Sequence, residues 1–233
     1  MKYVISDIHG RLDRLEKMVD LIELKEEDTL YVLGDMVDRG SEPIGVIKYI
    51  MKRRNIEVIM GNHDRMMIKA LRYKDDKELK RWSRNGYETT LEGLNNLSEN
   101  KRNEILDFID GLEYFKIIDN SYLLVHAGYD PVKLKEDLKT MKLEDALMNQ
   151  EERLVWEREK FFKEPGLKEY TVIFGHTPRP YIDEKFEEES ELPYKIWFDK
   201  KYNNKICVDT GNCYEEGRMA CLRLEDMKEF YID

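Results

Sequence analysis

Two carboxylates and one arginine lie within five residues of one another in the segment Gly34 to Gly40, which reads GDMVDRG. The segment follows the apolar run Thr29 to Leu33, which is typical of a buried strand. Solvation alone does not require such crowding of charge directly after a strand. We therefore interpret Asp35, Asp38 and Arg39 as part of a site for a polyvalent ligand, and two metal ions are the ligand that we expect.

The chain has four histidines, and each stands at the downstream end of a short apolar run. The runs lead into DIHG, GNHD, HAG and GHT, and their content of Val, Ile and Tyr is typical of strands in a covered sheet. Ligands collect at the carboxyl ends of strands in open α/β sheets, so we expect five strand ends to converge on one place. The histidines are His9, His63, His126 and His176.

Taken in order, these elements resemble the motif set of the calcineurin-like metallophosphoesterases. The set is Asp-x-His, Gly-Asp-x-x-Asp-Arg-Gly, Gly-Asn-His-Asp, His-Ala-Gly and Gly-His-Thr, and the resemblance extends from Met1 to about Leu224. The chain is most similar to the phosphoprotein-phosphatase branch, with its small bacterial and bacteriophage members, and it is close to the symmetrical dinucleoside tetraphosphatases. A lone histidine after a strand is usually a satisfied core residue, but the chance that all five elements occur here in order by accident is below roughly 1%.

The resemblance implies a set of metal ligands. One ion would be bound by Asp7, His9 and Asp35, and the other by Asp35, Asn62, His126 and His176, so that Asp35 bridges the two ions. Imidazoles, carboxylates and an amide oxygen suit borderline divalent ions, so we expect two such ions, Mn²⁺ in vitro, with Fe or Zn as alternatives. Mg²⁺ with retained waters is less natural beside three imidazoles.

The resemblance also implies roles for the residues around the ions. A hydroxide that bridges the ions would attack phosphorus in line, without a covalent phosphoenzyme. Arg39 and Arg158 would bind non-bridging phosphoryl oxygens, and Asn62 would be a further substrate contact. His63 would protonate the leaving alkoxide while Asp38 keeps its ring oriented, so the expected catalytic residues are His63, Asp38 and Arg39.

Three further segments bear on the comparison with small bacterial members. The segment Trp82 to Thr89 resembles their Trp…Asn-Gly…Thr signature, and a helix anchor followed by an Asn-Gly turn is the alternative interpretation. Arg158 lies in LVWEREKF, similar to a Trp-x-Arg…Phe element, although most arginines on charged helices are solvated. The form Asp209-Thr210-Gly211, like GNHD, departs from the eukaryotic enzymes, which does not favour a dedicated protein substrate but leaves the metal chemistry unchanged.

The elements that carry these residues alternate in the first half of the chain. Apolar residues recur at helical spacing between Leu12 and Ile22, and a second helix is expected over Pro43 to Asn55. Such βαβ units predict parallel pairing of the strands. We expect a helical excursion at about residues 65–112, and then a β-hairpin from Glu113 to Val125 that turns the second half of the sheet system antiparallel.

The length of 233 residues predicts a single α/β metallophosphoesterase domain over residues 1–233. The resemblance, and not the periodicity, implies the architecture, which is a four-layer α/β/β/α sandwich of two mixed sheets with helices on both outer sides. The site is then expected at one rim of the sandwich.

Composition limits the partners and the compartment. A hydrophobic fraction of 41% with 38% charged residues fits a soluble globular protein, and no apolar run reaches the roughly 18 residues of a membrane span. Because no secretory signal opens the chain, we expect a cytoplasmic protein. A net charge of −10 disfavours binding of long nucleic acid.

Two further expectations concern a loop and the cysteines. Glu184 to Glu191 is expected to be an exposed acidic loop. The three cysteines are expected to be reduced, buried residues on terminal strands, and they are Cys207, Cys213 and Cys221.

The leading hypothesis for function is a dinuclear-metal phosphoric-ester hydrolase. Its substrate would be phosphoserine or phosphothreonine in proteins, with phosphotyrosine and small phosphomonoesters as further substrates. The alternatives are a symmetrical dinucleoside tetraphosphatase, which shares nearly every motif, and a nucleotide or RNA-end phosphodiesterase. A non-catalytic docking module of the same fold is a remote alternative, because such a module would be expected to lack ligands or the acid, and none is missing here. The sequence predicts neither a regulatory partner nor an oligomeric state.

Overall fold

The computed structural model describes residues 1–186 and 194–233, which form two five-stranded sheets. The first sheet has the strand order β10-β9-β1-β2-β3, and the second has the order β4-β5-β6-β8-β7. The strands of the first sheet are β1 (Lys2–Ile5), β2 (Thr29–Val32), β3 (Ile56–Val58), β9 (Met219–Arg223) and β10 (Lys228–Ile232). Those of the second sheet are β4 (Phe115–Ile118), β5 (Tyr122–Val125), β6 (Thr171–Phe174), β7 (Trp197–Phe198) and β8 (Lys205–Cys207).

Both sheets are mixed, as predicted. In the first sheet β1, β2 and β3 are parallel, whereas β9 pairs antiparallel with β1 and β10. In the second sheet β5, β6 and β8 are parallel, and β4 and β7 pair antiparallel at the two edges. The predicted β4–β5 hairpin is confirmed, but the expectation that the second half turns antiparallel is wrong for its centre. Long connections return the chain to the same end of the sheet before β6 and β8, which gives parallel pairing.

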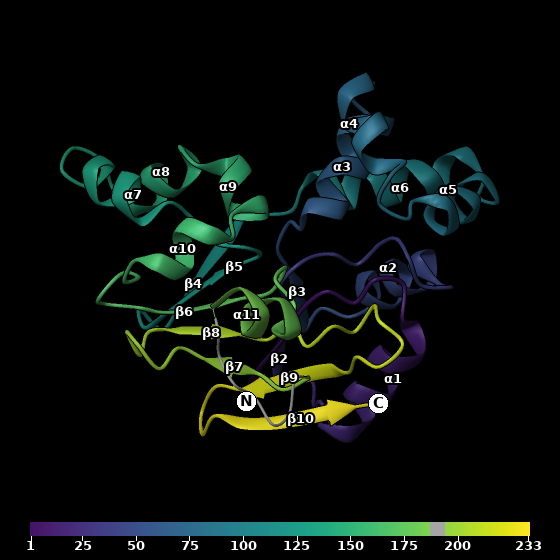
Figure 1. The fold of residues 1–233 in the computed structure, drawn as a ribbon. Coiled ribbons are helices and arrows are strands. Elements are labelled where there is room, and N and C mark those ends of the chain that lie inside the picture. The colour runs from purple at the N-terminus through teal and green to yellow at the C-terminus, as the bar shows by residue number, and fades with distance from the viewer. Residues whose placement is uncertain (187–193) are drawn as a thin grey trace.

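Helices connect the strands and form two groups on the two sides of the sheets (Figure 1). The group of the first half comprises α1 (Leu12–Leu21), α2 (Pro43–Met51), α3 (Asn62–Leu71), α4 (Asp76–Trp82), α5 (Glu88–Asn95) and α6 (Glu99–Asp110). The group of the second half comprises α7 (Pro131–Asp137), α8 (Leu143–Met148), α9 (Glu151–Trp156), α10 (Glu159–Lys163) and α11 (Arg179–Phe186). Within the described residues, no helix is long and apolar enough to cross a membrane.

Three groups of buried apolar side chains separate the layers. In β1, Tyr3 and Ile5 pack with side chains of α1, α2, α3 and α6, whereas Val4 packs between the two sheets. In β6, Ile173 shares that inner group, whereas its neighbour Phe174 faces the helices of the second half. Successive side chains of a strand point to opposite faces, so this alternation gives the order helices, sheet, sheet, helices. The four-layer sandwich that the resemblance implied is confirmed.

Some boundaries differ from the predictions. The helix expected over Pro43 to Asn55 ends at Met51, because the chain turns after it and the Arg53 N–H bonds the Ile50 carbonyl oxygen before β3 begins. The expected helical excursion corresponds to α3–α6. The acidic run Glu184 to Glu191 begins inside α11, and its part from residue 187 onward lies outside the described residues.

Candidate metal centre

The predicted metal ligands and His63 lie at the carboxyl ends of five strands, and the fold brings them together. They follow β1, β2, β3, β5 and β6, and each side chain has an exposed fraction of 6% or less. Most of them line one cavity of about 80 Å³. The buried site residues are Asp7, His9, Asp35, Asn62, His63, His126 and His176.

Several of these strand ends have a left-handed backbone. Asp7, His9, Asp35 and His176 have φ values of 48°, 46°, 53° and 63°, and Arg39 has a φ of 68°. A non-glycine residue pays on the order of 1–3 kcal/mol for such a sparsely populated conformation, and strain of this kind clusters at functional sites. The turns are therefore held in place by the surrounding structure rather than by their own preference.

Two glycines allow the end of β2 to touch the start of α3. Gly34 has a φ of +85°, and a Cβ atom on it would lie 2.5 Å from the Cα atom of Gly61. A Cβ atom on Gly61 would in turn lie 2.2 Å from the backbone nitrogen of Asp35. Only glycine permits this close approach at both positions. The contact brings Asp35 beside Asn62 and His63, which open α3.

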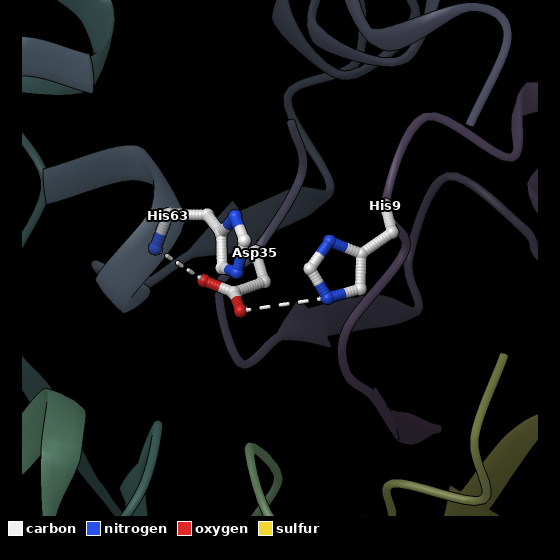
Figure 2. Close-up of side chains that lie close together, drawn as sticks. All are labelled: His9, Asp35 and His63. Atoms are coloured by element: carbon white, nitrogen blue, oxygen red, sulfur yellow. Dashed lines mark hydrogen bonds and ion pairs between the residues drawn. The ribbon is translucent and has the colours of Figure 1, made fainter. Parts of the chain in front are cut away.

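His9, Asp35 and His63 form the first group of potential metal ligands (Figure 2). One ligand atom of each lies within 4.8 Å of the others. His9 Nε2 is 3.6 Å from Asp35 Oδ2, and the His63 backbone N–H donates to Asp35 Oδ1 at 2.9 Å. Asp7 lies slightly farther away, with Oδ1 4.0 Å from His9 Nε2. Asp7 Oδ2 accepts the backbone N–H of His176 at 2.9 Å, so Asp7 links this group to the second one.

Asp35, His126 and His176 form the second group, so Asp35 belongs to both. His126 Nε2 lies 3.6 Å from Asp35 Oδ2. The other ring nitrogen, Nδ1, donates to the Leu33 carbonyl oxygen at 2.6 Å, which leaves a lone pair on Nε2. Asn62 Oδ1 lies 2.9 Å from that same Nε2. Two acceptors at this distance repel each other unless a cation draws on both lone pairs, so the arrangement fits a shared metal ion.

Burial sets the protonation states of the groups in a way that suits a metal. It lowers the pKa of His126, and it lowers the pKa of His9 and His176 well below the ordinary value of 6.5, so these imidazoles are neutral at pH 7. Burial, with the carboxylate of Asp7 nearby, raises the pKa of Asp35 well above its ordinary value. Metal ligands must be neutral imidazoles and ionised carboxylates, and a divalent ion would offset the cost of ionising Asp35 here. The donor set fits borderline divalent ions.

His63 and Asp38 are paired in a buried network. His63 Nδ1 donates to Asp38 Oδ2 at 2.6 Å, and Trp82 Nε1 donates to the same oxygen at 2.8 Å. The Thr90 hydroxyl donates to Asp38 Oδ1 at 2.7 Å. Burial raises the pKa of Asp38 to about 7, while the hydrogen bonds from Thr90 and Trp82 oppose this rise. The network fixes the orientation of the His63 ring.

The threonine of this network differs from the one that the sequence pattern singled out. Thr89 completes the Trp…Asn-Gly…Thr pattern, but its buried hydroxyl has no hydrogen-bond partner among the described residues. Thr90 contacts Asp38 twice, because its hydroxyl oxygen also accepts the Asp38 backbone N–H at 2.9 Å. Adjacent threonines differ only in the helix face they occupy, and the sequence does not show which face of α5 meets Asp38.

Asp64, for which the sequence predicted no role, accepts hydrogen bonds from three backbone amides of the site. Its Oδ2 accepts the N–H of Asp35 at 2.7 Å and that of Gly61 at 3.2 Å, and its Oδ1 accepts the N–H of Met36 at 3.1 Å. It was visible as the last residue of the GNHD motif, but its partners in the β2 turn lie 28 and 29 residues away.

Asn212 supports the first ligand turn in the same manner. Its Nδ2 donates to the carbonyl oxygens of Asp7 at 3.1 Å and Ile8 at 2.8 Å. Arg14 of α1 donates to Asn212 Oδ1 at 3.0 Å, which orients the amide. The only signal for this residue in the sequence was its place directly after Asp-Thr-Gly.

We expect Asp64→Ala to lower the free energy of unfolding of the metal-free protein by at least about 3 kcal/mol. Three buried N–H groups would lose their acceptor, and each unsatisfied donor costs about 1–3 kcal/mol. Urea denaturation measures the change. The matched control is Asp130→Ala, because Asp130 is also buried but caps α7, where losing a cap costs about 1 kcal/mol. A loss no greater than that of the control would contradict the prediction.

The two predicted phosphate-binding arginines line the same cavity. Arg39 places Nη1 3.0 Å from His9 Nε2 and Nη2 3.1 Å from His63 Nε2. Arg158 is not on a helix: it lies between α9 and α10 with φ −130° and ψ −70°, and its Nη2 donates to the His176 carbonyl oxygen at 3.1 Å. A solvated position on a charged helix is therefore wrong for Arg158.

The three cysteines are free. Cys207 and Cys221 are buried in β8 and β9, as predicted. The prediction is wrong for Cys213, which lies in the loop between these strands, lines the cavity and places Sγ 3.2 Å from Arg39 Nη1. This loop runs along the cavity because Asn212 ties it to the turn after β1.

The fold resembles solved structures of phosphatases. The chain aligns with a protein serine/threonine phosphatase from Saccharomyces cerevisiae at a TM-score of 0.60 and 17% identity, over 99% of this chain and 78% of that one. It aligns with a cold-active protein-tyrosine phosphatase of a Shewanella species at a TM-score of 0.59 and 15% identity, over 100% and 80% of the two chains. At these identities the likeness shows the fold alone.

Sequence comparison identifies the family. The chain is 25% identical to a symmetrical bis(5'-nucleosyl)-tetraphosphatase of Nitrosospira multiformis over 99% of its own length and 95% of that protein. A protein of the same name from Buchnera aphidicola subsp. Schizaphis graminum is 30% identical over 60% of this chain, which spans about half (48%) of that protein. Residues 3–208 match the model of the calcineurin-like phosphoesterases. The chain belongs to the calcineurin-like phosphoesterase family and is a hydrolytic enzyme.

Proposed function

We propose that this enzyme is a metal-dependent phosphomonoesterase that acts on phosphoserine, phosphothreonine or phosphotyrosine in proteins and on small phosphate esters. The observation that carries the proposal is the size of the cavity. Its volume is about 80 Å³, whereas sites that enclose a drug-sized ligand measure about 300–1,000 Å³. Such a cavity suits a single phosphoryl group, with the rest of the substrate outside.

Two divalent ions would be held by the ligands that the motifs name, Mn²⁺ in vitro, with Fe or Zn as alternatives. When bound, they would supply positive charge to the phosphoryl oxygens and lower the pKa of water so that it becomes a nucleophile at neutral pH. The ligands would be Asp7, His9 and Asp35 for one ion and Asp35, Asn62, His126 and His176 for the other. We assign His63 to catalysis rather than to this set on the motif resemblance alone, because its hydrogen bond to Asp38 through Nδ1 leaves Nε2 able to serve either role.

Arg39 and Arg158 would bind the phosphoryl group from two sides of the cavity. A guanidinium presents N–H donors in a planar fork that matches the spacing of phosphoryl oxygens. Arg39 donates toward the lone pairs of His9 and His63, and it would exchange these contacts for phosphoryl oxygens. Asn62 lines the same cavity and is the third expected substrate contact.

His63 would protonate the leaving oxygen from Nε2. Its Nδ1–H is held by Asp38, so the proton that moves is the one on Nε2. Burial, with Arg39 and His126 nearby, lowers the pKa of His63 well below its ordinary value, so Nε2 carries no proton before the substrate binds. The ring would take up a proton on Nε2 from solvent when the anionic phosphate ester binds and draws Arg39 away, and it would then pass that proton to the leaving oxygen. Asp38 would stabilise the charged ring before the transfer.

Symmetrical cleavage of dinucleoside tetraphosphates is the second candidate. The names of the relatives from Nitrosospira and Buchnera favour it. Against it stands the small extent of the cationic site, because Arg39 and Arg158, beside the two expected metal ions, are the only cationic side chains among the described residues that line the cavity. A tetraphosphate would present several negative charges over a greater length than this cavity covers.

Product analysis distinguishes the two candidates. Metal-stripped protein reloaded with Mn²⁺ is expected to release inorganic phosphate from a phosphopeptide and to leave diadenosine tetraphosphate largely intact. Ion-exchange chromatography of both reactions, run in parallel, gives the products, and the His63→Asn variant controls for contaminating phosphatase. Rapid conversion of diadenosine tetraphosphate to two ADP, with little phosphate from the peptide, would overturn the proposal in favour of the second candidate.

A further inference from the structure

Two arginines of the first helical group reach α9 in the second group. In Figure 1 the α3–α4 pair and α9 are drawn as separate bodies on the two sides of the molecule's upper half. Across the space between these two groups, Arg65 of α3 and Arg81 of α4 contact residues of α9. The contacted residues of α9 are Glu151, Glu152 and Trp156. We call these two residues and their contacts the arginine bridge.

The first half of the bridge joins Arg65 to Glu151 at the start of α9. Arg65 Nε and Nη2 both donate to Glu151 Oε1 at 3.3 Å, and the Tyr114 hydroxyl donates to the same oxygen at 2.7 Å. The Arg65 side chain is only 15% exposed. An exposed ion pair contributes little, but a partly buried guanidinium that loses its carboxylate partner is costly. This contact therefore fixes the start of α9 relative to α3.

The second half joins Arg81 to Trp156 at the end of α9. The Arg81 guanidinium carbon lies 4.9 Å from the centre of the Trp156 ring, within range of a cation–π interaction. Arg81 is held in place by Glu78 Oε1 at 3.1 Å, and Glu152 Oε1 lies 3.7 Å from it. The bridge thus contacts α9 at both ends.

The end of α9 leads directly to the phosphate-binding side of the cavity. The Trp156 ring lines the cavity and meets the His176 ring edge-on, with centroids 5.8 Å apart. Arg158 follows two residues later and donates to the His176 carbonyl oxygen. Because α9 has only six residues, a shift of its first turn is passed on to Trp156 and Arg158.

We propose that Arg65 and Arg81 are positioning residues, which set the place of Arg158 relative to His63 across the cavity by fixing α9. The inference rests on the proposed role of Arg158 in binding the phosphoryl group. His63 lies in the first turn of α3, two residues before Arg65. The bridge therefore joins the helix that bears the proposed proton donor to the helix that precedes Arg158, the proposed phosphate ligand. Neither arginine of the bridge lines the cavity, so neither is itself a substrate contact.

Charge reversal tests the bridge. Arg65→Glu is expected to raise the inhibition constant of inorganic phosphate about tenfold in the Mn²⁺-loaded enzyme, since a charge-assisted hydrogen bond such as the one expected from Arg158 contributes at least about that factor to binding. The double variant Arg65→Glu/Glu151→Arg is expected to recover most of the loss. The matched control is Arg72→Glu, because Arg72 follows α3 but pairs with Asp107 and Asp110 inside its own helical group. The control is expected to leave the inhibition constant unchanged.

A second comparison separates positioning from a loss of folding. In an Arg158→Ala background, Arg65→Glu is expected to add no further change, because the residue that it positions is gone. The inference would be overturned if Arg65→Glu raised the inhibition constant of phosphate just as much in the Arg158→Ala background, or if it left that constant unchanged in the otherwise wild-type enzyme. Either result would leave the proposed function standing. Calorimetric binding of phosphate gives the same comparison without turnover. If the wild-type enzyme hydrolyses no phosphate ester, the proposed function fails separately.

Discussion

Asp35→Asn is expected to abolish the binding of both metal ions and the activity together. Asp35 Oδ2 lies 3.6 Å from Nε2 of His9 and 3.6 Å from Nε2 of His126, so one carboxylate serves both groups of potential ligands. The asparagine keeps the shape and the Oδ1 acceptor but removes the charge that holds a divalent ion. Metal ions supply several kcal/mol of charge stabilisation, so activity should fall by about 10³-fold or more.

Metal content by mass spectrometry of the purified, reloaded protein measures this effect, and phosphate release measures the activity. Asp107→Asn is the matched control, because Asp107 is exposed and pairs with Arg72 far from the cavity. Burial raises the pKa of Asp35, so its charged form is the unfavourable one in the folded, metal-free protein. The variant should therefore unfold at no lower temperature than wild-type protein when both are metal-free. Full occupancy of both ions in the variant would show that neither ion needs the Asp35 carboxylate.

His63→Asn is expected to slow hydrolysis of alkyl phosphates by about 10²–10⁴-fold, because these leaving groups need a proton and general acid catalysis contributes that much. Hydrolysis of p-nitrophenyl phosphate, whose leaving group is stable as an anion, should change far less. Metal content should stay at the wild-type level, because the asparagine keeps the backbone N–H that Asp35 accepts.

The ratio of the two substrates makes His63→Asn its own control, since a folding defect would lower both rates equally. His63 also belongs to the first group of potential ligands, together with His9 and Asp35. Loss of one ion from the variant, with both substrates slowed alike, would identify His63 as a ligand and remove it from the role of acid. Wild-type rates on alkyl phosphates would exclude both roles.

The two helical groups support opposite sides of the same cavity. His63 and Asp38 belong to the side of the cavity that α3–α6 support, and Arg158 and His176 belong to the side that α9 and β6 support. A variant of the arginine bridge is expected to change how these two sides are placed relative to each other without removing any side chain that lines the cavity. Comparing this variant with His63→Asn and Asp35→Asn therefore distinguishes three effects: loss of the proton donor, loss of metal binding and displacement of Arg158.

Much of the site could be predicted from the sequence, because each of its motifs consists of residues that are adjacent in the chain. An apolar run that ends in glycine and a polar side chain marks a strand end, and strand ends of parallel segments meet at one edge. The strand patterns could not show how distant strands pair, so the parallel centre of the second sheet was missed. Parallel pairing there depends on where long connections return the chain, which no local pattern records.

The sequence by itself determined the family, the set of candidate ligands and the residues His63 and Asp38, since these are read from motifs of three to seven adjacent residues. Only the tertiary structure decided that Thr90 rather than Thr89 contacts Asp38, and that Arg158 lies in the cavity rather than on a solvated helix. It also decided the supporting role of Asn212, whose partner Asp7 lies 205 residues away. Such contacts form when separate layers pack together, and their free energy depends on neighbours that are distant in the chain.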